Sequence, residues 1–248
     1  MAMSKQRIKV DFLVHDLKVP LAVIEAGITS LIQKTDKYGP LTEKQLKVLK
    51  RALRNTLLTR NLVNDALELG RSSEGVEQKT IFPLSSLVEQ SLVEIFDLTD
   101  QDTADRIRAC DSLGEIKKML SEKNILLEID DGLWHQDICM DESKIRQILR
   151  NLLNNALKYR KKQVELKIEK REGAFFVLIR DDGDGIPAHY HSKIFECYFQ
   201  MDMQQEHCVR GHGLGLAGVM VLVEDMGGQL FLDSDAGKGA TFSVTVPL

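Results

Sequence analysis

Two long helical patterns separated by a short turn are the feature that most constrains the fold of this 248-residue chain. Apolar residues recur at steps of three and four in residues 4–37 and again from Thr42 to about Leu69, so each segment is expected to form a helix with one apolar stripe. Tyr38-Gly39-Pro40 ends the first helix, and Thr42 with Gln45 forms a capping box for the second. The members of the two stripes are Leu13, Leu17, Leu21, Ile24, Ile28 and Leu31, then Leu46, Leu49, Leu53 and Leu57.

A lone antiparallel hairpin cannot bury both stripes, so the pattern predicts a homodimer in which two hairpins form a four-helix bundle. Residues 70–75 are rich in Gly and Ser and divide an all-α hairpin over residues 1–73 from a mixed domain over residues 74–248. Because strands and helices do not alternate strictly in the second domain, an α+β two-layer sandwich is favoured over a doubly wound fold. Residues 97–111 are polar and are expected to form a loop. Strands are expected at 78–82, 125–129, 164–170, 175–180, 228–233 and 241–246, and helices at 84–98, 113–122, 141–159 and 214–226.

The composition limits the classes of partner. Hydrophobic residues make up 43% of the chain and charged residues 28%, as in ordinary globular proteins. The formal net charge of −4 argues against a nucleic-acid partner, and no apolar stretch reaches 18 residues. The four cysteines lie more than ten residues apart, so reduced thiols in a cytoplasmic protein are expected. A solvated loop is favoured over a metal site for the group His189, His191, His207 and Cys208.

One histidine of the first helix is a candidate nucleophile. On a helical wheel, His15 lies about 160–200° from Leu13 and Leu17, so its ring is predicted to point away from the apolar stripe. Asp16 follows directly, and a carboxylate there could fix the tautomer of the ring. Pro20 is expected to bend the helix just past this point. Taken alone, the pattern also fits a surface histidine without a chemical role.

Polar residues form a second stripe on the predicted helix at 141–159. Gln147, Asn151, Asn155 and Lys158 recur at steps of four, four and three, apart from the apolar face of that helix. Asparagine oxygens are suitable ligands for Mg²⁺, and a lysine adds a charge for phosphate. Tyr159 is placed to pack on a nucleoside. A merely solvated helix face is the alternative.

Two glycine-rich turns complete the candidate site. The motif Asp-x-Gly-x-Gly at residues 181–185 follows an apolar strand, and Asp181 could accept a hydrogen bond from an adenine amino group. A plain tight turn is the alternative there. The motif Gly-x-Gly-x-Gly at residues 211–215 opens a predicted helix, whose N-terminal N–H groups favour phosphate. It lacks the upstream strand of a dinucleotide fingerprint and the Lys-Ser/Thr of a P-loop. Residues 186–210 are expected to form a mobile lid.

With these motifs, the chain resembles the cytoplasmic kinase core of bacterial two-component sensor histidine kinases over nearly its whole length. The segments at residues 195–199 and 237–242 add to the resemblance. It implies a dimerisation and phosphotransfer hairpin over residues 1–73, followed by a catalytic ATP-binding sandwich of the Bergerat or GHKL type over residues 74–248. Gyrase, Hsp90 and MutL proteins have a similar ATP-binding fold but lack the phosphoacceptor helix.

The resemblance also implies roles for single residues. His15 corresponds to the phosphorylated histidine, Asp16 to the adjacent acidic base, and Asn155 to the Mg²⁺ ligand. Asn151 corresponds to the residue that meets the acidic base during transfer, and it is a further candidate ligand of Mg²⁺. The implied nucleotide-binding set is Asn151, Asn155, Lys158, Tyr159, Asp181, Gly183, Gly185, Ile186, Arg210, Gly211, His212, Gly213, Leu214, Gly215, Leu216 and Thr241.

The expected function is therefore ATP- and Mg²⁺-dependent phosphorylation of His15, followed by transfer to an aspartate on the receiver domain of a response regulator. A membrane is expected only through a sensor region absent from this chain. Val19 replaces the family's usual Thr or Asn, which predicts weak phosphatase activity. Gln200 replaces a common Arg or Lys, for which Arg210 is a candidate substitute, and residues 97–123 are longer than usual. The alternatives are a degenerate kinase acting as a nucleotide- or regulator-binding scaffold, and a clamp-type ATPase of the gyrase class.

Overall fold

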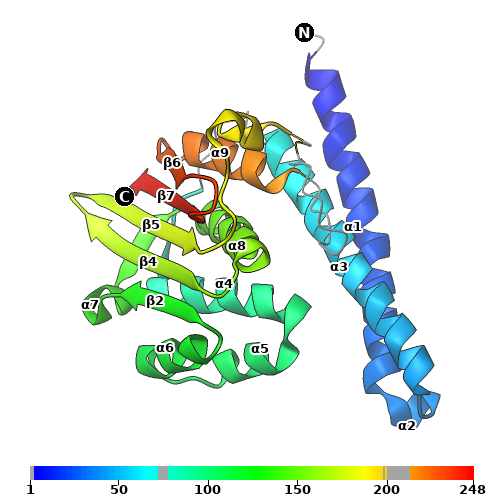
Figure 1. Cartoon of the computed structure of the whole chain (residues 1–248). Coiled ribbons are helices and arrows are strands. Elements are labelled where there is room, and N and C mark those ends of the chain that lie inside the picture. Colours follow the sequence, from blue (N-terminus) through cyan, green and yellow to red (C-terminus); the bar gives the residue numbers. More distant parts are fainter. Residues whose placement is uncertain (1–2, 72–77, 198, 200–212) are drawn as a thin grey trace. The chain divides into compact units, whose positions relative to one another are not determined.

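A computed structural model describes residues 3–71, 78–197, 199 and 213–248 of the chain (Figure 1). Within these ranges, the side chains of residues 3–16, 58, 61–62, 64–71 and 98 lie outside the description. The chain divides into two compact units, Met1–Ser73 and Glu74–Leu248. Each unit is described by itself below.

The first unit is a helical hairpin of α1 (Met3–Gln33), α2 (Thr35–Tyr38) and α3 (Glu43–Arg71). The single helix predicted for residues 4–37 is interrupted at Lys34, whose φ and ψ of −101° and 59° are not helical. Gly39 then ends α2 with a φ of 84°, a backbone conformation that glycine adopts without a steric cost. The predicted capping box is confirmed, because the N–H of Thr42 donates to Gln45 Oε1 at 2.9 Å and the N–H of Gln45 donates to Thr42 Oγ1 at 3.3 Å.

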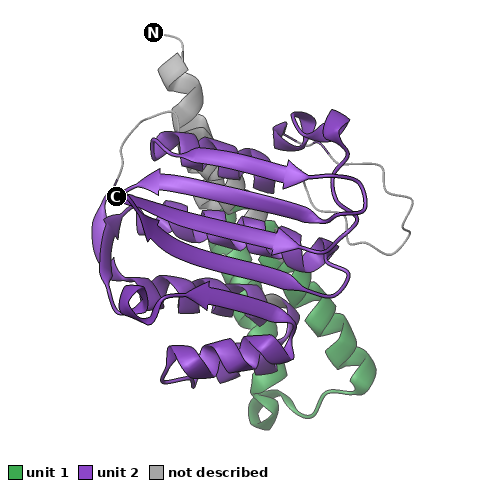
Figure 2. Cartoon of the chain, turned by 60° about the vertical axis from the view of Figure 1, so that its left-hand side comes forward, with its two compact units in different colours: residues 1–73 green, residues 74–248 purple. Residues whose placement is uncertain are grey.

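The second unit is built on a five-stranded mixed sheet in the order β2-β4-β5-β7-β6. β2 runs parallel to β4, and the other neighbours are antiparallel. The helices lie against one face of this sheet (Figure 2). The predicted α+β two-layer fold is therefore confirmed. The strands are β2 (Ile125–Ile129), β4 (Val164–Arg171), β5 (Ala174–Asp181), β6 (Gln229–Ser234) and β7 (Ala240–Pro247), and the three longest helices are α4 (Leu84–Thr99), α8 (Glu142–Tyr159) and α9 (Gly215–Asp225).

Alternation along the strands decides which side chains reach the core. In β4, Val164, Leu166 and Ile168 are buried beneath the helices, whereas the residues between them are partly exposed on the opposite face. The register continues across the sheet, where Val164 pairs with Asp181 and Asp181 pairs with Ala240. Asp181, the last residue of β5, therefore directs its carboxylate to the face of the sheet that the helices cover.

Several elements were not predicted, and they include η2 (Ala188–Tyr190) and η3 (Lys193–Phe195) in the segment expected to form a lid. The loop expected at residues 97–111 is wrong, since α5 (Gln101–Arg108) lies there, followed by α6 (Leu113–Glu122). Ile107 is the one large apolar residue that α5 buries, alongside Thr103 and Ala104, so a periodic apolar signal was too weak to recognise. The short strand β3 (Asp137–Met140) pairs with β1 (Thr80–Pro83), and the single-turn helix α7 (Asp131–Trp134) precedes it.

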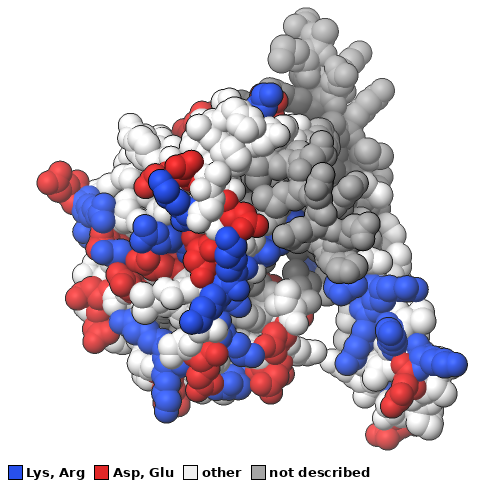
Figure 3. All heavy atoms as spheres, viewed as in Figure 1, with Lys and Arg blue, Asp and Glu red and all other residues white. Residues whose placement is uncertain are grey.

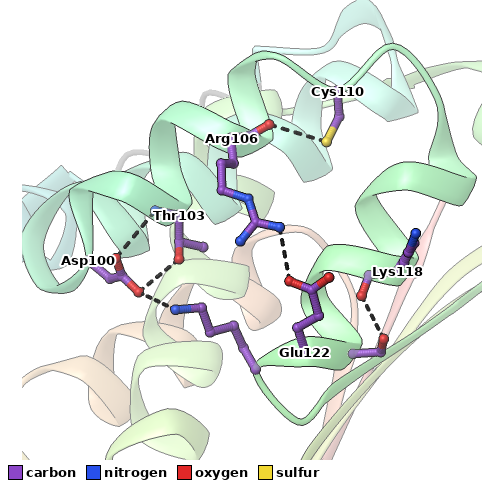
Figure 4. Close-up of polar contacts among 8 residues, drawn as sticks. Asp100, Thr103, Arg106, Cys110, Lys118 and Glu122 are labelled. Carbon is purple, nitrogen blue, oxygen red and sulfur yellow. Dashed lines mark hydrogen bonds and ion pairs between the residues drawn. The ribbon is translucent and has the colours of Figure 1, made fainter.

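Polar contacts hold α5 against the end of α6 (Figure 4). The side chain of Asp100 accepts hydrogen bonds from the N–H of Thr103 and from Lys123 Nζ, the latter at 2.6 Å. The bond from Lys123 is the main cause that lowers the pKa of Asp100 to about 2. Arg106 donates to Glu122 at 2.9 Å across the same two helices. Capping and cross-helix pairing, rather than a long apolar stripe, therefore define this segment.

Candidate active site

Helix α8 supplies the amide-bearing face of the candidate site. Asp141 caps the helix by accepting a hydrogen bond from the N–H of Lys144 at 3.1 Å. The predicted polar stripe divides by depth: Gln147 and Asn151 are buried, whereas Asn155 is half-buried. Asn151 is only 9% exposed, and its Nδ2 donates to the carbonyl oxygen of Gly215 at 3.4 Å. One amide of the stripe thus joins α8 to the start of α9.

The exposed end of α8 carries a cation and a ring side by side. Lys158 Nζ donates to the hydroxyl of Tyr159 at 3.0 Å and lies 4.7 Å from the centre of that ring. Tyr159 is 42% exposed, which leaves its ring accessible to another flat group. The loop after α8 is fixed by Asp182, whose Oδ1 accepts hydrogen bonds from three consecutive N–H groups at residues 161–163. These bonds lower the pKa of Asp182, a residue that the sequence did not single out.

The carboxylate of Asp181 lies at the end of β5 and is only 7% exposed. Its Oδ1 accepts a hydrogen bond from the N–H of Gly183 at 2.9 Å. Burial raises the pKa of Asp181, and hydrogen bonds from the N–H groups of Gly183 and Ala240 oppose that rise. A Cβ at Gly183 would lie 2.3 Å from the carbonyl oxygen of Tyr159. The structure therefore brings the end of α8 and the first glycine turn into direct contact.

The next residues of the turn pass close to the strand connection between β6 and β7. Gly185 has a φ of 71°, and a Cβ there would lie 1.9 Å from the carbonyl oxygen of Asp235. The N–H of Ile186 donates to Ser234 Oγ at 2.8 Å, and this hydroxyl donates to the carbonyl oxygen of Gly239 at 2.7 Å. Ser234 and Gly239 are thus structural members of the site that were missing from the predicted set. Gly239 stood in a recognised closing motif, but nothing in the sequence marked Ser234.

The second glycine turn is described in part. Arg210, Gly211 and His212 lie outside the described residues, as does Gln200. Gly213 has a φ of 69°, and Gly215 is the first residue of α9. Leu214 precedes the helix with an apolar, buried side chain that cannot cap it, so the N–H groups of the first turn remain suited to an anion. Leu216 is half-buried against the core.

The remaining members of the predicted set are Thr241, His15 and Asp16. Thr241 follows Ala240 in β7, so alternation directs its side chain to the sheet face opposite to that of Asp181. Thr241 and Asp181 therefore lie on opposite faces of the sheet. His15 and Asp16 belong to α1, but their side chains lie outside the described residues.

Two further kinds of site, a surface groove and a metal site, were considered in the described residues. A groove of about 830 Å³ lies along the ends of β2 and β4, beside α6 and α7, and none of the predicted nucleotide-binding residues lines it. The part of the chain that the structure describes contains no cluster of three His, Cys, Asp or Glu residues able to hold a metal. His207 and Cys208 of the suggested metal group fall outside that part.

Comparisons with known proteins agree with this arrangement. Residues 10–75 match the model of the His Kinase A (phospho-acceptor) domain, and residues 140–248 match that of the histidine kinase-, DNA gyrase B- and HSP90-like ATPase. The chain is 31% identical to the circadian input-output histidine kinase CikA of Synechococcus elongatus over 94% of this chain and 29% of that protein. It is 28% identical to the sensor histidine kinase YkoH of Bacillus subtilis, over 93% of this chain and 45% of that protein.

Solved structures support the same fold. The full-length ShkA crystal structure, a complex with AMPPNP, has a TM-score of 0.64 and 24% identity over 96% of this chain and 45% of that chain. The histidine kinase AdeS of Acinetobacter baumannii has a TM-score of 0.56 and 18% identity over 94% of this chain and 97% of that chain.

The chain spans 29% and 45% of the lengths of CikA and YkoH, so it corresponds to one portion of these larger proteins. Among the described residues, no helix combines the length and the apolar character that a membrane span requires. One domain model matches the helical hairpin, and the other matches the part of the sandwich that holds the glycine turns. The chain therefore belongs to the two-component sensor histidine kinases.

Proposed function

We propose that this chain binds ATP in its second unit, transfers the γ-phosphoryl group to Nε2 of His15, and passes it on to an aspartate of a response-regulator receiver domain. In the first step an N–P bond forms, the bond between the γ-phosphorus and the bridging oxygen breaks, and ADP leaves. The observation that carries the proposal is the convergence of a buried carboxylate, two glycine turns, an uncapped helix start and an amide-bearing helix within one unit.

The side chains fit a nucleotide and its metal. Asp181 lies deep enough to read an adenine amino group without competition from water, and Tyr159 offers a ring face. Lys158 and the start of α9 supply positive potential for phosphates. Asn155 would hold Mg²⁺, with Oδ1 of Asn151 as a second candidate ligand because its Nδ2 is already bonded to Gly215. A bound Mg²⁺ would neutralise the charge on the phosphate oxygens.

The two units would divide the work. The unit 1–73 serves dimerisation and phosphotransfer, and the unit 74–248 serves catalysis. In a single chain, Leu17, Ile24 and Leu31 of the α1 stripe are 42%, 49% and 37% exposed. Burying this apolar row against a second copy would be favourable, so a homodimeric four-helix bundle follows from the hairpin itself.

The test is labelling of the full chain with γ-labelled ATP. We expect Mg²⁺-dependent incorporation of a label that is stable in base and lost in acid, as for a phosphoramidate on an imidazole. ATP binding without a label would favour the scaffold alternative. Steady phosphate release without a labelled protein would favour a clamp-type ATPase.

A substitution at the buried carboxylate separates stability from nucleotide recognition. Because burial raises the pKa of Asp181, the ionised form costs stability at pH values above that raised pKa, and this cost fades as pH falls through it. Asp181→Asn is therefore expected to leave thermal stability at pH 8 unchanged or higher. Loss of a hydrogen bond to a charged acceptor, about 1.5–3 kcal/mol, predicts ATP binding weaker by roughly 10- to 150-fold.

Asp184→Asn is the matched control, because Asp184 is exposed and forms a surface ion pair with Lys161. Calorimetric titration of ATP into both variants and thermal melts at pH 5 and pH 8 measure the two effects. Equal ATP affinity in Asp181→Asn and in the unmodified chain would exclude the adenine role.

Residue 19 has neither a hydroxyl nor an amide, and this affects the expected dephosphorylation of the regulator. Val19 is 55% exposed on α1, one turn beyond His15, and its side chain cannot orient a water molecule. We expect weak dephosphorylation of a phosphorylated regulator by this chain. Val19→Thr should raise that rate about fivefold, which is the effect of one hydrogen bond of about 1 kcal/mol. Val19→Ala is the control, and a threonine variant no faster than the alanine variant would reject the explanation.

A further inference from the structure

The half-buried imidazole of His191 faces back toward the first glycine turn. Its Nε2 lies 2.9 Å from the carbonyl oxygen of Ile186, five residues earlier in the chain. Because a carbonyl oxygen can only accept a hydrogen bond, Nε2 carries the hydrogen and donates it. The residues between them form the single turn η2, in which the N–H of Tyr190 donates to the carbonyl oxygen of Pro187 at 2.9 Å. The side chain of His191 therefore closes this turn onto the residue that follows the glycine motif.

Side chains hold both backbone groups of Ile186. Its N–H donates to Ser234 Oγ at 2.8 Å, and its carbonyl oxygen accepts from His191. Among the residues that the structure describes, neither group pairs with another backbone group. Ile186 is only 8% exposed, so water has little access to replace a lost partner. The conformation of the chain after Gly185 therefore depends on one hydroxyl and one imidazole.

The imidazole also lies beside the connection between β6 and β7. The carboxylate of Asp235 is close enough to His191 for their charges to interact, although a hydrogen bond from Lys238 is the main cause that lowers the pKa of Asp235. The carbonyl oxygen of Asp235 faces Gly185, where a Cβ would lie 1.9 Å away. His191 thus lies where the glycine turn, η2 and the β6–β7 connection meet.

The segment that carries His191 is packed against the core at its other end. Ile194 of η3 is only 8% exposed, and η3 contacts both η2 and α9. Helix α9 begins at Gly215, in the second glycine turn. His191 therefore links the turn that follows Asp181 to a segment that packs on the helix whose start is suited to phosphate.

Long-range attraction gives ATP little help at this site. Residues 74–248 contain 20 Lys and Arg against 30 Asp and Glu, a net charge of −10. Charges of both signs are mixed over the face of this unit that Figure 3 shows. Such a net charge repels a polyanion such as ATP at a distance. The affinity for ATP must therefore come from groups that are held in place before it binds.

We propose that His191 is a positioning residue for nucleotide binding, which acts through Ile186 and does not itself touch the nucleotide. The proposal rests on the proposed function and adds to it a residue outside the predicted nucleotide-binding set. With the hydrogen bond in place, the turn from Asp181 to Ile186 is held in the shape that fits ATP. Without this bond, only a fraction of the molecules has that shape, and the apparent affinity falls by the same fraction.

This role predicts an effect on ATP affinity and none on the transfer step. Replacing His191 leaves Lys158, the start of α9 and His15 unchanged, so a chain saturated with ATP should be labelled at the normal rate. Loss of one hydrogen bond to a shielded carbonyl oxygen should weaken ATP binding roughly five- to tenfold. The Michaelis constant for ATP should rise by the same factor.

The test compares three substitutions of His191 in the full chain. His191→Leu keeps a side chain of similar size but removes the donor. Glutamine and asparagine are both polar, but only the amide nitrogen of glutamine reaches the position of Nε2. We expect the weaker binding in His191→Leu and His191→Asn, and an affinity within about twofold of that of the unmodified chain in His191→Gln. His189→Leu is the matched control, because it removes an exposed histidine of the same turn, whose ring centre lies 4.0 Å from that of Tyr190.

Calorimetric titration of ATP with Mg²⁺ measures the affinity, and the ATP dependence of His15 labelling separates the Michaelis constant from the saturating rate. Fluorescence of the buried Trp134 during urea unfolding confirms that each variant is folded. Should the leucine variant fail to fold, the glutamine and asparagine variants decide the question by themselves.

Normal affinity in His191→Asn would overturn the proposal. So would an equal loss in His191→Gln and His191→Asn, an equal loss in His189→Leu, or a lower saturating rate with normal affinity. Failure of the unmodified chain to bind ATP would instead reject the proposed function itself. ATP binding without a label on His15 would reject only the transfer step, and the titrations would still decide the role of His191.

Discussion

Replacing His15 by glutamine is expected to remove all acid-labile label from the chain. Glutamine keeps a polar side chain of similar reach and a high helix propensity, so α1 should persist. Its amide nitrogen has no nucleophilic lone pair, and the phosphoryl group would have no acceptor. Phosphoryl transfer depends on positioning and charge stabilisation around one attacking atom, so no partial activity is expected from the neighbours of residue 15. Gel autoradiography after incubation with γ-labelled ATP measures the loss.

Two controls make this result specific. ATP affinity should be unchanged in His15→Gln, because the residues that fit the nucleotide all lie in the second unit. His135→Gln should keep its label, since His135 is an exposed residue at the end of α7 and is not among the residues of the candidate site. A label that persists in His15→Gln would show that another residue accepts the phosphoryl group.

The helices and strands that were predicted correctly share one property. The residues of each segment and its immediate neighbours indicate its structure without any contact to distant residues. Residues 125–129 and 113–122 were predicted with the bounds that the structure has, because turn or cap residues flank a clear apolar pattern there. The capping box of Thr42 and Gln45 is likewise a local interaction over three residues. The second helix of the hairpin therefore began where the sequence indicated.

The failures came from interactions that join distant segments. Helix α5 is held by Asp100 contacting Lys123, which is 23 residues away. Strand β3 is only four residues long and exists because β1 pairs with it across more than 50 residues. Neither contact can be read from the residues of the segment itself. The sequence therefore predicts a polar loop in place of α5 and no strand in place of β3.

The candidate site shows the same division. Motif spacing identified Asp181, Gly183 and Gly185, because an Asp-x-Gly-x-Gly turn directly after an apolar strand is visible in the sequence itself. Ser234 was missed because its role depends on bridging Ile186 and Gly239, which only the folded sheet brings together. Thr241 was included by motif, yet the pleat directs its side chain to the other face. Spacing alone thus located the turns of the site but not the side on which each strand residue lies.

A second large effect is expected from Gly185→Ala. The added methyl group would lie 1.9 Å from the carbonyl oxygen of Asp235 and 2.9 Å from its carbonyl carbon, and both are backbone atoms that cannot swing aside. The variant must also hold a left-handed φ of 71°, which costs about 1–2 kcal/mol for a residue with a Cβ. Forcing apart a packed contact adds about 1–3 kcal/mol. The expected loss of unfolding free energy is therefore about 2–5 kcal/mol, with ATP binding lost.

Gly237→Ala separates the two causes, because Gly237 has a φ of 81° in the adjoining turn and nothing within 4 Å of the added methyl group. It should lose only the conformational part, about 1–2 kcal/mol. Trp134 is the only tryptophan of the chain and is buried in the second unit, so its fluorescence during urea unfolding reports on this unit alone. If both variants lost the same stability and the same ATP affinity, the close approach of residue 185 to Asp235 would have no part in shaping the site. A larger loss in Gly185→Ala would mean that the contact between the first glycine turn and the β6–β7 connection holds Asp181 and Ile186 in place, and that ATP binding depends on a backbone contact that no side chain provides.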